Sequence, residues 1–91
     1  MGYLRKAAIY ATGYNDALKN LVFRIQCGGD TKEYRRNMIR IPSEYCTPAR
    51  EREYRKGYAA GNVFGKLIYK ECDCDVEKLQ VELEKYKKCQ D

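Results

Sequence analysis

The 91-residue sequence contains no histidine, no tryptophan and only two prolines. Histidine is the side chain most often used as a general base, so its absence removes the commonest acid–base arrangement. No serine or cysteine lies in a recognisable nucleophile motif. Paired acids such as Glu51 and Glu53 are two residues apart and would point in different directions on a helix. We therefore expect a protein that is not an enzyme and that uses no cofactor.

The sequence also lacks an uninterrupted apolar run long enough for a membrane span or a signal peptide. Arg5 and Lys6 interrupt the first apolar residues, and Lys56, Lys66 and Lys70 interrupt the later glycine-containing stretch. These features predict a cytoplasmic protein with no membrane partner. The five cysteines are an odd number, which in that compartment indicates reduced thiols rather than a disulfide framework.

Charge is distributed unevenly along the chain, whose net charge is +5. Residues 1–70 contain 14 Lys and Arg against 6 Asp and Glu, whereas residues 71–91 contain 4 against 7. A basic body of this kind predicts an acidic partner, either RNA or an acidic protein surface. The length suits one helical domain over residues 1–91, small enough that oligomerisation would help to stabilise it.

Glycine occurs where a helix is otherwise expected. Residues 47–70 have the pattern of one long helix, yet Gly57, Gly61 and Gly65 recur in it at intervals of four. Each glycine costs about 1 kcal/mol relative to alanine in a helix interior, and this spacing places all three on one face. Close approach of another backbone would explain them.

A second version of this pattern lies 44 positions earlier. Each copy reads aromatic, two residues, glycine, aromatic, two residues, small residue, and the copies begin at Tyr10 and Tyr54. Gly13 and the small residues near it give the earlier helix a matching face. We therefore expect two unequal copies of a long helix followed by a shorter one, with the two small faces packed together.

Apolar residues in steps of three and four predict four helices. They are expected over residues 2–26, over about 31–41, over 48–70 and from 76 onward. Asp30 and Glu33 form a capping-box pattern before the second helix, which Pro42 should end. Thr47 followed by Pro48 is typical of the start of the third. The predicted fold class is an all-α small bundle of two long and two short helices with an internal helix-pair pseudo-repeat, in which the long helices run in the same direction.

Eight cations occur within the 25 residues from 32 to 56, and tyrosines are interspersed among them. Such a surface can contact phosphates and stack on exposed bases. Acidic residues also occur there, so a solvated helix face with weak ion pairs is the alternative interpretation. The candidate nucleic-acid or anion-binding residues are Arg35, Arg36, Arg40, Arg50, Tyr54, Arg55 and Lys56.

A metal site is a weaker hypothesis. Cys72 and Cys74, together with Cys27 at the same end of the expected bundle, could supply three thiolates. The paired Cys-x-x-Cys motifs of zinc knuckles are missing, so we favour partly buried thiols at helix ends and expect no metal. Cys46 and Cys89 are interpreted as buried thiols.

The repeated motif is similar to that of ribosome modulation factor and the small phage and bacterial proteins like it. That family repeats an aromatic-or-histidine, glycine-aromatic, small pattern in two short helices, with a cysteine and a proline before the second copy. Cys46-Thr47-Pro48 stands in the corresponding place here, although the two copies are farther apart and tyrosine replaces tryptophan. The resemblance implies a basic, non-enzymatic protein that docks on ribosomal RNA and neighbouring ribosomal proteins.

Two functions therefore remain open. The first is an RNA- or ribosome-binding regulator. The second is a homo-oligomeric helical inhibitor or interaction protein of phage or mobile-element type, assembled through the glycine face or the final helix. Such an oligomer would bind a protein or sequester a small anionic or nucleotide ligand.

Overall fold

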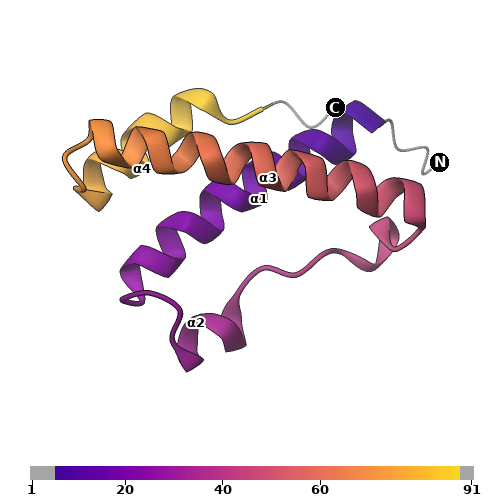
Figure 1. Cartoon of the computed structure of the whole chain (residues 1–91), viewed down its shortest axis with the longest axis horizontal. Coiled ribbons are helices and arrows are strands. Elements are labelled where there is room, and N and C mark those ends of the chain that lie inside the picture. Colours follow the sequence, from indigo (N-terminus) through magenta and orange to yellow (C-terminus); the bar gives the residue numbers. More distant parts are fainter. Residues whose placement is uncertain (1–5, 89–91) are drawn as a thin grey trace.

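Two long helices form the body of the protein, and each is followed by a shorter one (Figure 1). The computed structural model describes residues 6–88, and in this range there is no strand. The elements are α1 (Lys6–Gln26), α2 (Lys32–Asn37), the 3-10 helix η1 (Ser43–Tyr45), α3 (Pro48–Glu71) and α4 (Val76–Tyr86). The predicted all-α class, with two long and two short helices, is confirmed. The expected start of the first helix, at residues 2–5, lies outside the described residues.

The long helices α1 and α3 pack against each other and run in the same direction, as predicted (Figure 1). Gly57 lies against the backbone of Tyr10, and Gly61 lies against that of Tyr14. Farther along both helices, Gly65 faces the side chain of Leu18. Because the residue numbers increase in the same direction along both helices at the contact, α1 and α3 are parallel.

The glycines are required by this contact. A Cβ atom on Gly57 would fall on the carbonyl oxygen of Tyr10, and one on Gly13 would fall on that of Tyr54. At Gly61 the nearest atom would be the carbonyl oxygen of Tyr14 at 2.5 Å. The small faces therefore meet inside one chain, and the expectation that an oligomer assembles through the glycine face is wrong.

The two long helices also end in the same way. Beyond α1 the chain enters the left-handed region at Gly28, where φ is +82°, and beyond α3 it does so at Asp73, where φ is +57°. In each case the next N–H donates to the carbonyl oxygen five residues earlier, at 2.9 and 3.0 Å. This Schellman arrangement satisfies carbonyl groups that the last turn leaves free. The internal repeat thus extends to the helix ends.

Helix α2 differs from the prediction at both ends. Its N-cap is Thr31, whose Oγ1 accepts the N–H of Tyr34 at 3.1 Å, and not Asp30. The carboxylate of Asp30 instead pairs with Arg35 at 3.3 Å, so the predicted capping box with Glu33 does not form.

Helix α2 is also shorter than expected, with six residues. Met38 adopts an extended conformation, with φ −64° and ψ 149°. The N–H of Ile39 donates to Asn20 Oδ1 at 3.1 Å instead of continuing the helix. A side chain of α1 therefore ends α2 before Pro42 can.

The helix starts beyond α2 agree better with the sequence. Helix α3 begins at Pro48 with Thr47 at the N-cap, although the Thr47 side chain makes no capping hydrogen bond. Asp75 caps α4 and accepts the N–H groups of Glu77 and Lys78.

The core lies where α4 crosses the pair of long helices. Leu79 and Leu83 of α4 are 0% and 2% exposed and pack with Leu18 and Ile68. Beyond α4, Asn15 holds the backbone of Lys88 through two hydrogen bonds of 2.8 Å. Helix α4 and its tail therefore close one side of the α1–α3 pair. Within residues 6–88, no helix is both long and apolar enough to cross a membrane.

The helix contact predicts different costs for two glycine substitutions. Gly57→Ala should lower the free energy of unfolding by about 1–3 kcal/mol, because the added methyl group meets backbone. Gly65→Ala is the matched control, since its Cβ would meet only the ends of Leu21 and Leu18, at 2.7 and 3.2 Å. These side chains can move, and the gain in helix propensity of about 1 kcal/mol offsets the crowding. Urea unfolding that shows equal costs would contradict the backbone contact.

Candidate functional site

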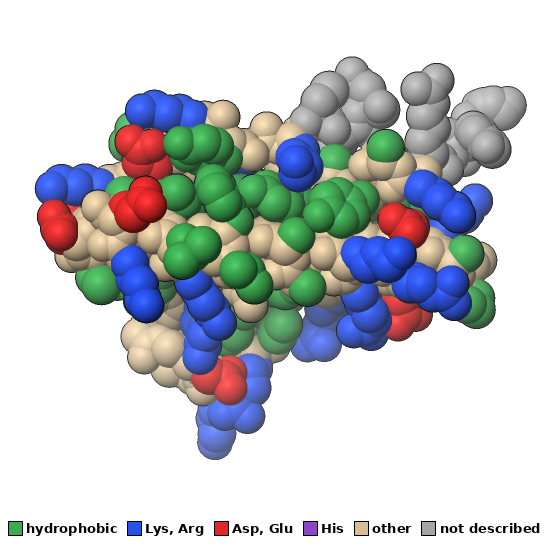
Figure 2. Space-filling model, turned by 45° about the horizontal axis from the view of Figure 1, so that its top comes forward, with side chains coloured by type: hydrophobic (Ala, Val, Ile, Leu, Met, Phe, Trp, Pro, Cys, Tyr) green, Lys and Arg blue, Asp and Glu red, His purple; other side chains and the backbone are tan. Residues whose placement is uncertain are grey.

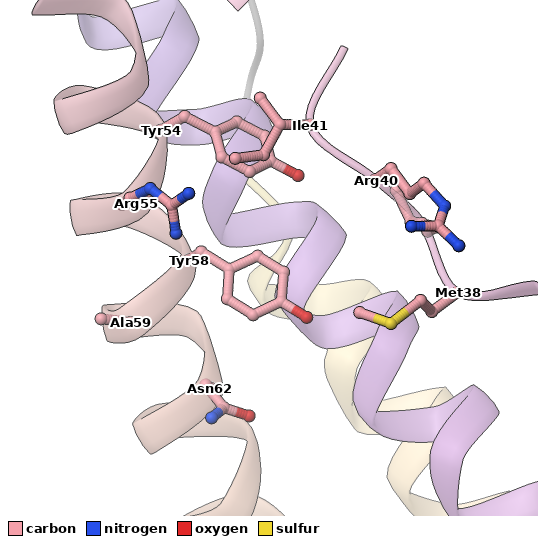
Figure 3. A pocket seen from close by; sticks show the side chains of 9 residues that line it. Met38, Arg40, Ile41, Tyr54, Arg55, Tyr58, Ala59 and Asn62 are labelled. Atoms are coloured by element: carbon pink, nitrogen blue, oxygen red, sulfur yellow. The ribbon is translucent and has the colours of Figure 1, made fainter. Parts of the chain in front are cut away.

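A groove runs between α3 and the extended segment that follows α2 (Figure 3). Its volume is about 500 Å³. We call it the Tyr58 groove. Its lining residues are Met38, Ile39, Arg40, Ile41, Tyr54, Arg55, Tyr58, Ala59 and Asn62. Most of this lining is apolar or aromatic, and the two arginines come from opposite sides.

A second hollow of about 400 Å³ adjoins the groove and shares Met38, Tyr58 and Asn62 with it. It extends the lining to Arg24 on α1 and Arg35 on α2. Four arginines and Asp30 therefore line the two hollows, which share Tyr58.

Tyr58 is held in place by a buried amide. Asn20 is 1% exposed, and its Nδ2 donates to the Tyr58 hydroxyl oxygen at 2.7 Å. Through Oδ1 the same amide accepts the N–H of Ile39 at 3.1 Å. The ring of Tyr54 flanks that of Tyr58, with centroids 6.2 Å apart. One side chain of α1 thus fixes both walls of the groove.

Tyr54 is the stacking residue that the sequence predicts, and its environment does not fit that role. It is 2% exposed, and its hydroxyl donates to Asp16 Oδ2 at 2.7 Å. Burial raises the pKa of Tyr54, and the hydrogen bond and negative charge of Asp16 raise it further. Tyr54 still lines the groove, but the tyrosine one turn later, Tyr58, is only partly buried and is the more accessible of the two rings. The interval of four residues is the only sequence signal for it.

The structure brings together three of the predicted cations. Arg40 and Arg55 line the Tyr58 groove, and Arg35 lines the adjoining hollow. Arg55 also pairs with Glu51 at 2.8 Å, in an exposed contact that contributes little to stability. Arg24 joins them and is not among the predicted residues, because the sequence places it far from the basic segment.

The other predicted cations lie outside the groove lining. Arg36 is exposed on α2. The guanidinium of Arg50 donates to the carbonyl oxygen of Glu44 at 3.2 Å. Lys56 pairs with Glu53 at 3.5 Å.

The cysteines do not form the arrangement that a metal site needs. In residues 6–88, no three His, Cys, Asp or Glu side chains gather into a group that could hold an ion, so Cys27, Cys72 and Cys74 do not converge. Burial raises the pKa of the Cys27 and Cys72 thiols, which favours the neutral form. Cys46 is exposed rather than buried, and Cys89 lies outside the described residues.

The raised pKa of Tyr54 predicts a loss of stability in alkali. Below pH 10 the phenol is protonated in both states, so its contribution is fully present. Above pH 10 the unfolded state releases the proton and the folded state retains it, so the free energy of unfolding should fall. One such group contributes a slope of up to about 1.4 kcal/mol per pH unit. Denaturant unfolding between pH 9 and 11.5 measures this slope.

Tyr54→Phe should make that alkaline slope shallower. Tyr86→Phe is the control, because it removes the same hydroxyl group from a tyrosine that is 44% exposed. Equal slopes in the two variants would show that Tyr54 is not held in the protonated form.

The repeated motif has a structural role in this geometry, because its glycines form the α1–α3 contact. The likeness to ribosome modulation factor therefore stays a prediction. No protein-family model, curated protein or solved structure matches the chain.

Proposed function

We propose that the protein is a non-enzymatic RNA-binding protein that contacts RNA through the Tyr58 groove and the arginines around it. The observation that carries this proposal is an aromatic groove with arginines from two different elements on its rim. Ribosomal RNA is the target that the motif resemblance favours.

The chemistry of the surface suits a nucleic-acid strand. Arg40 and Arg55 can each donate two parallel hydrogen bonds to a phosphate, while the aromatic wall between them offers a stacking surface. Figure 2 shows Lys and Arg side chains gathered near α2 and over the first turns of α3, with a few acidic ones between them. The exposed pairs of Arg35 with Asp30 and of Arg55 with Glu51 are weak enough for phosphate to replace the carboxylates.

The proposal predicts a salt-dependent affinity. Replacing Arg40 and Arg55 together by glutamine should weaken RNA binding and reduce the slope of log affinity against log salt by about 1 for each phosphate that is no longer bound. Filter binding at salt concentrations from 50 to 200 mM measures both quantities.

The matched control replaces Lys66 and Lys70 by glutamine. These lysines lie on the same helix and are exposed, and the double substitution removes the same charge outside the groove lining. An equal loss in both double variants would indicate a diffuse charge effect. Absence of RNA binding by the unaltered protein at 50 mM salt would reject the function.

Self-association is a second candidate, because α3 and α4 expose large apolar side chains. Val63, Leu67 and Val81 are 63%, 55% and 63% exposed, and Tyr86 is 44% exposed. Figure 2 shows hydrophobic side chains continuing across these helices. We call this surface the α3–α4 apolar face. Faces of this kind are typical of interaction sites.

The charges near the α3–α4 apolar face favour a second copy of the chain as its partner. Lys66 and Lys70 come from α3, whereas α4 carries Glu82 and Lys85, so both signs border the face. A twofold interface pairs a surface with itself and needs complementary groups of both signs. RNA would be attracted by the lysines of this border and repelled by Glu82.

Self-association predicts a dimer that depends on Leu67. Light scattering across 1–200 µM should give twice the mass of the chain for the unaltered protein, and Leu67→Glu should shift it toward the monomer. Ala49→Glu adds the same charge at an exposed position on the first turn of α3 and should leave the dimer intact. A monomer throughout this range would reject the candidate.

A further inference from the structure

We propose that the Tyr58 groove is a pocket for one unpaired nucleobase, so that the protein selects single-stranded over double-stranded RNA. This inference rests on the proposed RNA-binding function and specifies which form of RNA the groove accepts.

The first support is the fixed orientation of the Tyr58 ring. Its hydroxyl is held by the buried amide of Asn20, and one side is flanked by the buried ring of Tyr54. Tyr58 itself is only partly buried and lines the hollow. A rigid, accessible aromatic face loses little conformational freedom when a base stacks on it.

The second support is the opposite side of the groove. Met38 extends from the strand-like segment toward the hydroxyl end of Tyr58, and Ile41 lies beside Tyr54 (Figure 3). A polarisable thioether adapts to flat aromatic groups and packs well against them. The groove therefore presents apolar or aromatic groups from two elements to whatever enters it.

The third support is Asn62, a polar side chain of the groove lining that lies one turn beyond Tyr58 on α3. The Asn62 amide carries both donors and an acceptor, which match the edge of a base that has lost its pairing partner. In a duplex this edge is already paired and the base faces are stacked on their neighbours, so the groove could not receive them.

The fourth support is the size and charge of the site. A volume of about 500 Å³ is in the range of pockets that enclose small organic ligands. Arg40 and Arg55 come from opposite sides of the groove, and the adjoining hollow is lined by Arg24, Arg35 and one carboxylate, Asp30, which pairs with Arg35. A base in the groove would thus have cations within reach of the phosphates on both sides of its nucleotide.

The two copies of the repeat differ in how far the equivalent tyrosine is covered. Tyr14 occupies the place of Tyr58 in the first copy of the repeat, but it is 8% exposed. Phe64 packs beside it with ring centroids 6.2 Å apart, and Lys88 Nζ lies 4.7 Å from its ring centroid. The ring that α4 and its tail cover in one copy is left accessible in the other.

The test compares a 12-nucleotide oligouridine strand with a fully paired RNA duplex of the same length, using fluorescence anisotropy and the 91-residue protein. We expect the single strand to bind at least tenfold more tightly. Tyr58→Leu should weaken single-strand binding by about 5- to 150-fold, the range expected when an aromatic side chain that stacks on one base is removed. Tyr58→Phe keeps the aromatic face but loses the hydrogen bond from Asn20, so its loss of affinity should be smaller than that of Tyr58→Leu.

A second pair of variants tests the pocket independently, in case Tyr58→Leu does not fold. Ala59→Leu adds bulk to an exposed helix position inside the groove, and Ala49→Leu adds the same bulk outside it. The first should weaken single-strand binding and leave duplex binding unchanged, whereas the second should change neither. Circular dichroism melting verifies that both variants are folded.

The outcomes separate the inference from the proposed function. Equal affinity for single strand and duplex, or an Ala59→Leu variant that binds like the unaltered protein, would overturn the base pocket while leaving RNA binding intact. Polyglutamate that binds as tightly as oligouridine would also overturn it, because the site would then respond to charge alone. Failure to bind either RNA would reject both proposals.

Discussion

The backbone contact between α1 and α3 is the constraint on which the rest of the structure depends. Gly57 and Gly61 lie directly against carbonyl groups of α1, and Gly13 lies against α3. At this separation the helices leave no space between them for side chains, so larger residues must lie to either side of the contact. On one side the core forms with α4, and on the other side lies the Tyr58 groove. The glycines are costly in a helix, but they determine where every other packing group lies.

Two buried asparagines of α1 attach the remaining chain to this pair of helices. Asn15 binds the backbone of Lys88 on the side of α4, and Asn20 binds the backbone of Ile39 on the side of α2. An amide side chain offers a donor and an acceptor, as a peptide group does, and can therefore hold a segment that has left its helix. Because the amides of both residues are buried, removing either would leave backbone groups unsatisfied. The groove thus depends on Asn20 as much as on its lining.

Much of the fold could be predicted from the sequence, because periodicity, glycine spacing and the Thr47-Pro48 start are local signals. The capping of α2 could not, since Asp30 and Thr31 are both good caps and a contact with Arg35 distinguishes them. The residues of the candidate site were harder to predict from the sequence than the helices. Tyr54 and Tyr58 are both tyrosines with similar neighbours in sequence, so the sequence does not distinguish them. Their partners on α1 do: the hydroxyl of Tyr54 donates to Asp16, whereas the hydroxyl of Tyr58 accepts from Asn20 and its ring lines the groove.

The groove arises where the internal repeat breaks down. In both copies a long helix carries a tyrosine after its glycine, and both helices end in the same left-handed cap. The elements that follow are unequal, because α4 has eleven residues with a continuous apolar stripe and α2 has only six. Helix α4 can therefore cover Tyr14, whereas α2 and its extended tail reach Tyr58 only at its edge. The repeated residues build the frame, and the shortening of one copy leaves the aromatic surface on which binding is proposed.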